Sequence, residues 1–486
     1  ISLKIMGLEY LLQMEEGDKL ELDVIKKLIE QTNSKHSNFV KKADEAEKYY
    51  KNENDIIRDR SPNNVGKVNT ANNPLRNADN RIPFNWFGFL VNQKISYLFT
   101  YPPTFDVGDD GINSKITDIL GDRYPKEAKT LGKNASICSK AWLHVWEDDN
   151  NDFQYTNIDP RQIRAVYSSD LNRKLLAILR EYKKTDDKGK EYVIYEYWTD
   201  ECCYTYQNKD GNSNINRLEI LNKFIEKNLD NKLETQTNVY KHNFGEVPFI
   251  EFLNNDLEVR DLDNVKHLID VYDKVYSGFV NDIEDIQEVI FVLTNYGGAD
   301  LTEFLKGLKE YKTIDLQSSG ADDKSGLSTI TINIPIEARD SLLKTTEKQI
   351  YVQGQGVDPK PENFANTSGV ALKFLYTLLE LKAGLMETEF RLGFAKLVRM
   401  ICRHLGYSPK RVLQTWTRNM IQNDLELAEI CSKSVGIISE KTNLKNHPLV
   451  DNAEEEEKQI KKEKEDSNQE YNNVIPNNQD GVIDET

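Results

Sequence analysis

The chain has 486 residues, 38% hydrophobic and 29% charged, and its 63 basic and 80 acidic side chains give a formal net charge of −17. The length suggests about three structural units. The negative charge argues against tight nucleic-acid binding, which depends on Lys and Arg pairing with phosphates, and against docking on an anionic membrane. No uncharged apolar run reaches the roughly 18 residues that a membrane-spanning helix needs.

The N-terminal part of the chain reads as helical. We predict helices over Val24–Arg60, Ile82–Phe99 and Ile112–Leu131, with a polar, Asn-rich loop at Ser61–Asn80. The last of these helices precedes a marked change of pattern.

From residue 139 to about residue 254, short aromatic and β-branched runs alternate with turn clusters. This spacing is typical of antiparallel hairpins. The predicted strands are Ala141–Trp146, Phe153–Ile158, Gln162–Tyr167, Leu175–Tyr182, Tyr192–Trp198 and Cys203–Gln207.

The region Asp261–Leu293 carries a strict heptad pattern. Apolar residues recur in alternating steps of three and four from Leu262 to Leu293. We therefore predict a helix of 33 residues, about 50 Å long, that needs a partner along its apolar seam. The other faces of this helix are rich in Asp and Glu.

An excursion separates this helix from the next long one. We predict a short basic helix at Leu301–Tyr311, then a hairpin that pairs Lys312–Leu316 with Ser328–Ile334. Pro335 is suited to the first turn of a helix, which we expect over Ile336–Tyr351.

A loop rich in Gly and Pro, Gln353–Asn366, follows, and then a helix over Ser368–Leu405 with possible kinks at Gly384 and Gly393. Two shorter helices are predicted at Lys410–Met420 and Asp424–Ser432.

The tail from residue 451 to residue 486 has a net charge of −8, from 12 acids and 4 lysines, and should be disordered or a frayed helix. The fold class predicted for the whole chain is α+β, mainly helical.

Motifs for catalysis are missing from the sequence. No phosphate-binding loop or nucleophile elbow occurs, and Gly354-Gln355-Gly356 lacks the continuation of a nucleotide-binding fingerprint. Cys202 and Cys203 would point to opposite faces of a strand, so buried free thiols are a better reading than a zinc site. Asp148, Asp149 and Asp152 read as a turn, with a metal-binding cluster as the less favoured alternative. We predict no catalytic site, no metal and no cofactor.

Several segments, in order, resemble a known family. They are Lys48–Glu53, Asn80–Asn85, His242–Asn255, Leu268–Asp273 and Ser368–Phe374. Together they make the chain similar to the portal proteins of tailed bacteriophages, of the type found in long-tailed phages of Gram-positive hosts. The resemblance covers about residues 40–405.

The resemblance implies a portal fold with wing, stem, clip and crown. Residues 1–260 would form the wing, helical first and then antiparallel β. The remaining expected parts are a first stem helix (261–293), the clip (294–335), a second stem helix (336–352), the tunnel loop (353–367), a long wing and crown helix (368–407), the crown (408–450) and the acidic tail (451–486).

The family's function is implied in the same way. Twelve copies, or thirteen in recombinant material, would form a ring at one capsid vertex of the virion after assembly in the host cytoplasm. The ring would pass double-stranded DNA with loose, non-specific contacts during packaging and ejection. The expected partners are the terminase large subunit, the head–tail adaptor, the major capsid protein and the scaffolding protein, with no membrane.

The resemblance also suggests which residues carry this function. Stem acids would line the channel and repel DNA while the heptad seam packs on neighbouring stem helices, and clip lysines would meet the motor, the adaptor or DNA, or form a solvated face. The stem acids are Asp270, Asp273 and Glu284, the clip lysines are Lys306, Lys309 and Lys312, and the tunnel-loop residues facing DNA are Gln353, Gly354, Gln355, Gly356, Val357, Asp358, Lys360, Asn363 and Asn366.

Two other classes of protein remain open at this point. One is a coiled-coil scaffold built on the heptad seam, and the other is an enzyme whose site is cryptic in sequence. The size of the particle separates them from a portal, because only the portal predicts rings of twelve or thirteen subunits.

Overall fold

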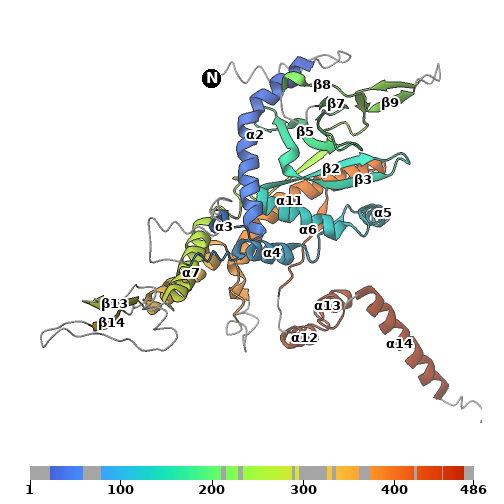
Figure 1. The fold of residues 1–486 in the computed structure, drawn as a ribbon. Helices are drawn as coiled ribbons and strands as arrows, with labels where there is room; N and C mark the ends of the chain where they lie inside the picture. The colour runs from blue at the N-terminus through green and yellow to red at the C-terminus, as the bar shows by residue number, and fades with distance from the viewer. Residues whose placement is uncertain are drawn as a thin grey trace, which may run out of the picture. The chain divides into compact units, whose positions relative to one another are not determined.

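A computed structural model describes most of the chain. The described residues are 22–58, 78–209, 215–227, 234–286, 290–294, 326–330, 335–360, 373–420, 424–450 and 453–474. They belong to two compact units, residues 1–356 with 378–419, and residues 357–377 with 420–486. The architecture is α+β with antiparallel sheets, as predicted (Figure 1).

Helices dominate the start of the larger unit. They are α2 (Leu22–Tyr50), α3 (Asp55–Arg58), α4 (Trp86–Phe99), α5 (Asp110–Leu120) and α6 (Tyr124–Cys138). The single helices predicted over residues 24–60 and 112–131 are wrong in one respect, because each is interrupted. The chain turns at Asn52 (φ 63°) and at Gly121 (φ 58°), and a helix cannot continue through a positive φ.

All six predicted strands are present. The strands are β2 (Lys140–Glu147), β3 (Phe153–Ile158), β4 (Ile163–Tyr167), β5 (Leu175–Thr185), β6 (Glu191–Trp198), β7 (Cys202–Asn208), β8 (Glu219–Ile220), β11 (Val239–Lys241) and β12 (Phe249–Leu253). The larger sheet has the order β11-β7-β6-β5-β4, with β8 also paired to β7, and the smaller has the order β12-β2-β3. A separate two-stranded sheet joins β9 (Phe224–Lys227) to β10 (Glu234–Thr237).

The larger sheet is buried on both faces. Leu179 packs in a cluster with Ile25 and Ile29 of α2, whereas its neighbour Ile178 packs with Trp142 of the smaller sheet. Successive side chains of a strand point to opposite faces, so α2 covers one face and the smaller sheet covers the other. In Figure 1, α2 runs along the strands of the larger sheet.

The second half of the larger unit is built on long helices. These are α7 (Lys266–Ile286), α9 (Ile336–Gln353) and α11 (Thr377–His404). The predicted helix over Ile336–Tyr351 is confirmed, and α11 confirms most of the helix predicted over Ser368–Leu405, whose first residues, 368–372, lie outside the described residues.

The heptad pattern overextends the first of these helices. α7 ends at Ile286, and the last two members of the pattern, Ile290 and Leu293, belong to strand β13 (Ile290–Thr294), which pairs with β14 (Gly326–Ile330). Lys312–Leu316, the first strand of the predicted hairpin, lies outside the described residues, and β14, which overlaps the predicted second strand Ser328–Ile334, pairs with β13. A short apolar run of β-branched residues fits a strand as well as a helix, and periodicity alone does not separate them. Residues 301–325, with the predicted basic helix, lie outside the described residues.

A second correction concerns Lys410–Met420, predicted as a helix. Within this stretch Leu413–Thr415 forms β15, which pairs antiparallel with β1 (Thr104–Asp106). This three-residue pairing places the segment after α11 beside residues 104–106 of the larger unit.

The smaller unit contains α12 (Asp424–Lys433), α13 (Glu440–Asn446) and α14 (Ala453–Val474). Ser439 caps α13 by accepting a hydrogen bond from the Thr442 amide, and Asn443 Nδ2 donates to the Cys431 carbonyl at 3.0 Å. The tail predicted as disordered or a frayed helix is helical over the length of α14. None of the helices described in either unit is both long and apolar enough to cross a membrane.

Candidate functional site

The pair formed by α7 and α9 is the candidate site, because most of the described residues among those singled out in the sequence lie on it or beside it. Arg339 near the start of α9 pairs with Asp282 near the end of α7, and its guanidinium lies over the Phe279 ring, 5.6 Å from the centroid. At the opposite end, Gly354 lies against Val265. The two helices are therefore antiparallel.

One face of α7 holds the segment before α4 through its backbone. The amides of Asn80 and Ile82 donate to Asn281 Oδ1 at 2.6 Å and to Ser277 Oγ at 3.0 Å, and the Phe84 amide donates to Asp273 Oδ1 at 3.0 Å. We call these three contacts the amide ladder.

The spacing of the amide ladder has a simple geometric cause. Four residues of helix advance about 6 Å, close to the advance of about 6.6 Å for two residues of extended chain. Acceptors at positions 273, 277 and 281 therefore meet every second amide of the segment. Pro83 falls between two of the donating positions, so its missing N–H costs the ladder nothing.

The first part of the heptad seam is covered inside the same chain. Leu262, Val265 and Ile269 are at most 1% exposed. Further along, the Phe84 ring lies edge-on to Tyr272 and Tyr276, with centroids 4.9 and 4.8 Å away. These first members of the seam are therefore covered within the chain, whereas Ile283, further along the heptad pattern, is 45% exposed. That the seam packs on neighbouring stem helices stays a prediction.

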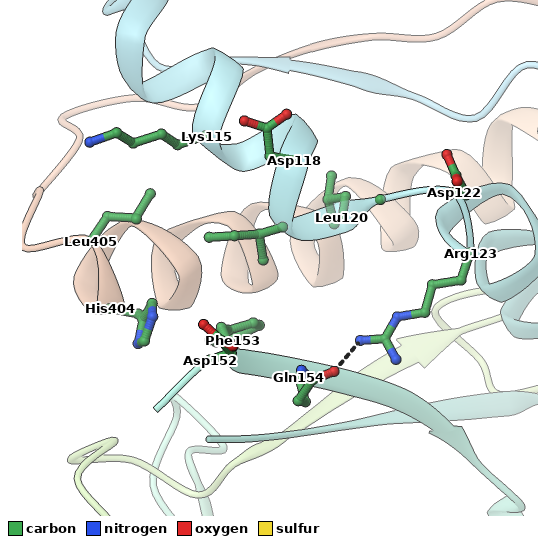
Figure 2. A pocket seen from close by; sticks show the side chains of 12 residues that line it. Lys115, Asp118, Leu120, Asp122, Arg123, Asp152, Phe153, Gln154, His404 and Leu405 are labelled. Carbon is green, nitrogen blue, oxygen red and sulfur yellow. Dashed lines mark hydrogen bonds between the residues drawn. The ribbon is translucent and has the colours of Figure 1, made fainter. Parts of the chain in front are cut away.

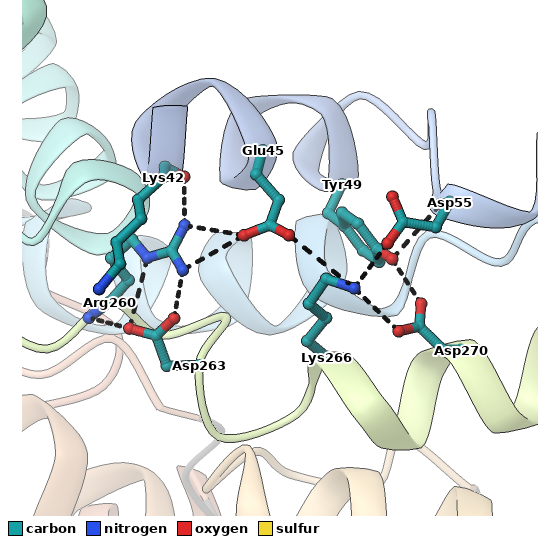
Figure 3. A network of polar contacts seen from close by, with 8 residues as sticks. All are labelled: Lys42, Glu45, Tyr49, Asp55, Arg260, Asp263, Lys266 and Asp270. Atoms are coloured by element: carbon teal, nitrogen blue, oxygen red, sulfur yellow. Dashed lines mark hydrogen bonds and ion pairs between the residues drawn. The ribbon is translucent and has the colours of Figure 1, made fainter. Parts of the chain in front are cut away.

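A polar network joins the start of α7 to α2 and α3 (Figure 3). Lys266 Nζ lies 2.6 Å from Asp55 and 3.0 Å from Asp270, and the ammonium also lies over the Tyr49 ring. Burial opposes the charge of Lys266, but these two carboxylates raise its pKa above the usual value. Tyr49 donates its hydroxyl proton to Asp270.

The network continues through Arg260. Its guanidinium pairs with Asp263 and with Glu45 at 3.4 Å, and it donates to the Lys42 carbonyl. Figure 3 shows Glu45 between Arg260 and Lys266, so α2 is attached on both sides of the first turn of α7.

Beneath the start of α7 lies a buried ion cluster. Asp261 Oδ2 is 2.6 Å from Lys94 Nζ and 3.2 Å from Lys382 Nζ, and all three side chains are at most 10% exposed. Lys94 also donates to Asn254 Oδ1 at 2.8 Å, and Lys382 donates to the Gly354 carbonyl at 2.9 Å. Burial lowers the pKa of Lys94 to about 8. Burial opposes ionisation of Asp261, but Lys382 and Lys94 outweigh it and hold that pKa at about 2.

The segment after α9 begins with a fixed turn. The amide of Gln355 donates to the Val352 carbonyl and the amide of Gly356 donates to the Tyr351 carbonyl, with Gln355 at φ 52°. This is a Schellman motif whose left-handed position, usually glycine, is a glutamine. The two glycines flank it where added Cβ atoms would lie 2.5 and 2.4 Å from Leu90, so Gly354 and Gly356 are required by close approach.

The predicted tunnel-loop residues therefore have different environments. Gln353 is the exposed last residue of α9, and Gln355 is partly exposed. The prediction that Gly354 and Gly356 face DNA is contradicted, because both are buried against α4. In the smaller unit, Asp358 and Lys360 form an ion pair at 3.6 Å and Val357 is buried. Asn363 and Asn366 lie outside the described residues.

The three stem acids also differ. Asp273 has no exposed surface, and Asn54 Nδ2 donates to it at 2.6 Å, so its assignment to a channel wall is wrong. Burial raises the pKa of Asp273 to about 6. Asp270 is partly exposed within the network of Figure 3, whereas Glu284 is exposed and accepts from Asn80 Nδ2. The clip residues Lys306, Lys309 and Lys312 lie outside the described residues.

Sequence reasoning missed what the amide ladder, Lys94, Asp261 and Lys382 do. One signal for the ladder was available, because Asp273, Ser277 and Asn281 recur every four residues on α7, and all three can accept a hydrogen bond. No sequence signal connects Lys94 to Lys382, since that pairing depends on the tertiary fold.

A cavity of about 660 Å³ lies between α5, the start of β3 and the end of α11 (Figure 2). Arg123 donates to Gln154 there at 3.1 Å, and His404 Nδ1 lies 2.9 Å from Glu147 Oε1. The residues that line the cavity include no Ser, Thr or Cys to act as a nucleophile. In the described ranges, no three His, Cys, Asp or Glu side chains are grouped to hold a metal ion.

The chemistry-bearing side chains outside the pair have structural surroundings. The Asp148 carboxylate accepts hydrogen bonds from the amides of Asn150 and Asp152, as expected for a turn. All five cysteines are free and buried, as predicted for Cys202 and Cys203, and burial raises the pKa of Cys138 to about 12.

Comparison with known proteins gives one consistent result. A family model described as "Phage portal protein, SPP1 Gp6-like" matches residues 29–470. The chain is 42% identical over 460 residues to the portal protein of Clostridium phage phiCD119, covering 92% of this chain and 96% of that protein. It is 29% identical over 429 residues to the portal protein of Bacillus phage SPP1, covering 86% of this chain and 82% of that protein.

Proposed function

This chain belongs to the SPP1 Gp6-like family of phage portal proteins, and from that membership we propose that its copies form a ring at one capsid vertex. Twelve copies are proposed for the ring in the virion, with double-stranded DNA passing along its axis during packaging and ejection. The proposed partners are the terminase large subunit, the head–tail adaptor, and the capsid and scaffolding proteins. The ring itself performs no catalysis in this proposal.

The observation that best supports a conduit is the antiparallel pair of α7 and α9 with a fixed turn at its end. We assign the stem to this pair, the clip to residues 294–335 and the tunnel loop to residues 353–367. Residues 1–260, before the stem, would form the wing. After the tunnel loop come the long helix 368–407, the crown 408–450 and the acidic tail 451–486.

The proposed DNA-facing set is smaller than the sequence suggested. It keeps Gln353 and Gln355, which are at least partly exposed, with Asp358 and Lys360 further along. In the stem it keeps Glu284 and Asp270, whose carboxylates retain exposed surface. Weak polar contacts and repulsion from carboxylates suit DNA that must slide, because stable Lys–phosphate pairs would slow it.

A coiled-coil scaffold is disfavoured by the covered seam. Leu262, Val265 and Ile269, the first members of the heptad pattern, already pack within one chain, so only the later part of the pattern, where Ile283 is 45% exposed, is open to a partner helix. The cavity in Figure 2 has no Ser, Thr or Cys in its lining, so an enzyme built on one of these nucleophiles finds no support there.

Electron microscopy of the purified full-length protein tests the proposal. Closed rings of twelve or thirteen subunits are expected, whereas a monomer or dimer under several buffer conditions would contradict the proposal. A second test concerns the loop. Deletion of residues 358–363, which spares the turn at Gly354–Gly356, should leave rings intact but reduce DNA packaging, and normal packaging would remove the loop from the DNA path.

The matched control for that deletion changes a turn far from the stem pair. Asp187 and Lys188 occupy the exposed turn between β5 and β6, and replacing both with glycine should affect neither ring formation nor packaging.

A further inference from the structure

We propose that Lys382 is a positioning residue for the turn after α9. By donating to the Gly354 carbonyl from the buried ion cluster, it would fix the point at which the chain leaves the larger unit after α9. Its Nζ donates to this carbonyl at 2.9 Å. The contact joins the end of α9 to α11 across 28 positions of sequence. It therefore closes the base of the intervening segment, which contains the proposed tunnel loop.

The ion cluster contains one more positive charge than negative charge, and we assign the additional charge to Lys382. One carboxylate, Asp261, faces two ammonium groups, so the cluster carries one cation more than a balanced pair needs. Buried unpaired charge is costly, and a stable core would be served by Lys94 and Asp261 alone. The additional cation is satisfied by the Gly354 carbonyl at the C-terminal end of α9, where a helix favours positive charge.

The turn at Gly354–Gly356, which the Lys382 contact adjoins, has a strained and closely packed backbone. Gln355 has a left-handed backbone, which is sterically unfavourable for a residue other than glycine. Gly354 and Gly356 lie so close to Leu90 that neither has room for a side chain. A strained turn persists only where its surroundings fix it, and the Lys382 contact is one of these constraints.

The test compares two lysines of α11 in the full-length protein. Lys382→Met removes the surplus charge and frees the Gly354 carbonyl. Lys396→Met is the matched control, because Lys396 also donates to a backbone carbonyl, that of Phe249 at 3.1 Å, and pairs with Glu246 at 3.4 Å. Hydrogen exchange of the peptide covering residues 351–357 and the thermal midpoint are measured for both.

We expect amide exchange in residues 351–357 to accelerate about tenfold or more in Lys382→Met, as for loss of a charged hydrogen bond. The thermal midpoint should be kept or raised, and Lys396→Met should exchange like the wild type in this peptide. Unchanged exchange in Lys382→Met would overturn the proposal. So would faster exchange spread equally over α4 and α7 with a lower midpoint, since Lys382 would then only stabilise the core.

If Lys382→Met does not assemble, Lys382→Gln provides the test, because it keeps a donor for Asp261 without the charge. The exchange results that support or overturn the proposal are the same for Lys382→Gln as for Lys382→Met.

An effect of Lys382 on packaging rests on the proposed function, and the two proposals can fail separately. Faster exchange at the turn with normal packaging would uphold the role of Lys382 and contradict the role of the loop in DNA passage.

Discussion

The backbone amide of Phe84 donates a hydrogen bond to Asp273 Oδ1 at 3.0 Å, although the two residues are 189 positions apart. Ser277 and Asn281 accept from the amides of Ile82 and Asn80 one and two helical turns later. Three side chains of one helix thus accept hydrogen bonds from every second amide of an extended segment, as the carbonyls of a paired strand would. The position of α7 along the segment before α4 is thus set by hydrogen bonds at regular intervals as well as by apolar packing.

Ser277→Ala should lower the free energy of unfolding by about 1–2 kcal/mol, because the partly buried Ile82 amide would lose its acceptor, the buried Ser277 hydroxyl. Urea unfolding measures this change. Ser341→Ala on the exposed face of α9 is the control and should change stability by less than about 0.5 kcal/mol. Equal effects of the two substitutions would mean that the amide ladder contributes nothing specific.

Asp273→Asn should flatten the dependence of stability on pH. The pKa of Asp273 is about 6 in the folded state, above its ordinary value of 3.8. The folded state therefore binds the proton more tightly, and the wild type loses on the order of 3 kcal/mol as the pH rises from about 4 to about 6. The variant lacks this loss.

Unfolding free energies at about pH 3 and about pH 7.5 test this slope, because both lie about one pH unit or more outside the range from about 4 to about 6 in which it develops. Ser277→Ala, which loses a neighbouring contact of the amide ladder but no carboxyl group, should keep the wild-type slope. Parallel profiles for Asp273→Asn and the wild type would rule out Asp273 as the source of the slope.

Two glycines of α11 should respond in opposite directions to alanine. A Cβ at Gly393 would lie 2.5–2.9 Å from the Phe252 ring, which is fully buried beside Phe390, so Gly393→Ala should destabilise by about 1–3 kcal/mol. Gly384 has nothing within 4 Å of an added Cβ, so Gly384→Ala should stabilise by up to about 1 kcal/mol. Thermal unfolding measures both, and changes of the same sign would contradict the packing described.

Gln355→Gly should stabilise the turn after α9 by about 1 kcal/mol, since glycine adopts a left-handed backbone without steric cost. Gly354→Ala, one residue earlier, should destabilise because its Cβ would lie 2.5 Å from Leu90. Urea unfolding of the two variants checks the contrast. Stabilisation by both substitutions would argue against the close approach of α4.

Local patterns in the sequence predicted the elements well where one pattern acted alone. Strand β3 has the predicted ends, Phe153 and Ile158, because alternation and turn residues coincide there. The helix predicted over Asp261–Leu293 extended too far because Ile290 and Leu293 fit two patterns. Only pairing with residues 326–330, more than 30 positions later, favours the strand.

The candidate site was less predictable than the fold. The acids of α7 were read as a solvent-facing or DNA-facing surface, yet Asp273 is buried and Asp270 accepts from Tyr49, 221 positions away. Charge on a helix predicts exposure only when no distant donor reaches it. The role of Lys382 depends on a backbone carbonyl, which leaves no trace in the sequence.

The short pairing of β1 with β15 has a mechanical consequence. Just beyond β15, Arg418 pairs with Glu380 at 2.8 Å and with Glu387 at 2.5 Å, and the Asn419 amide donates to the Tyr97 carbonyl at 3.0 Å. Tension applied to the chain beyond residue 420 would reach these contacts before it reached the sheets. These contacts, and not the β2–β7 strands, are therefore the first part of the larger unit to bear a force that comes through residue 420.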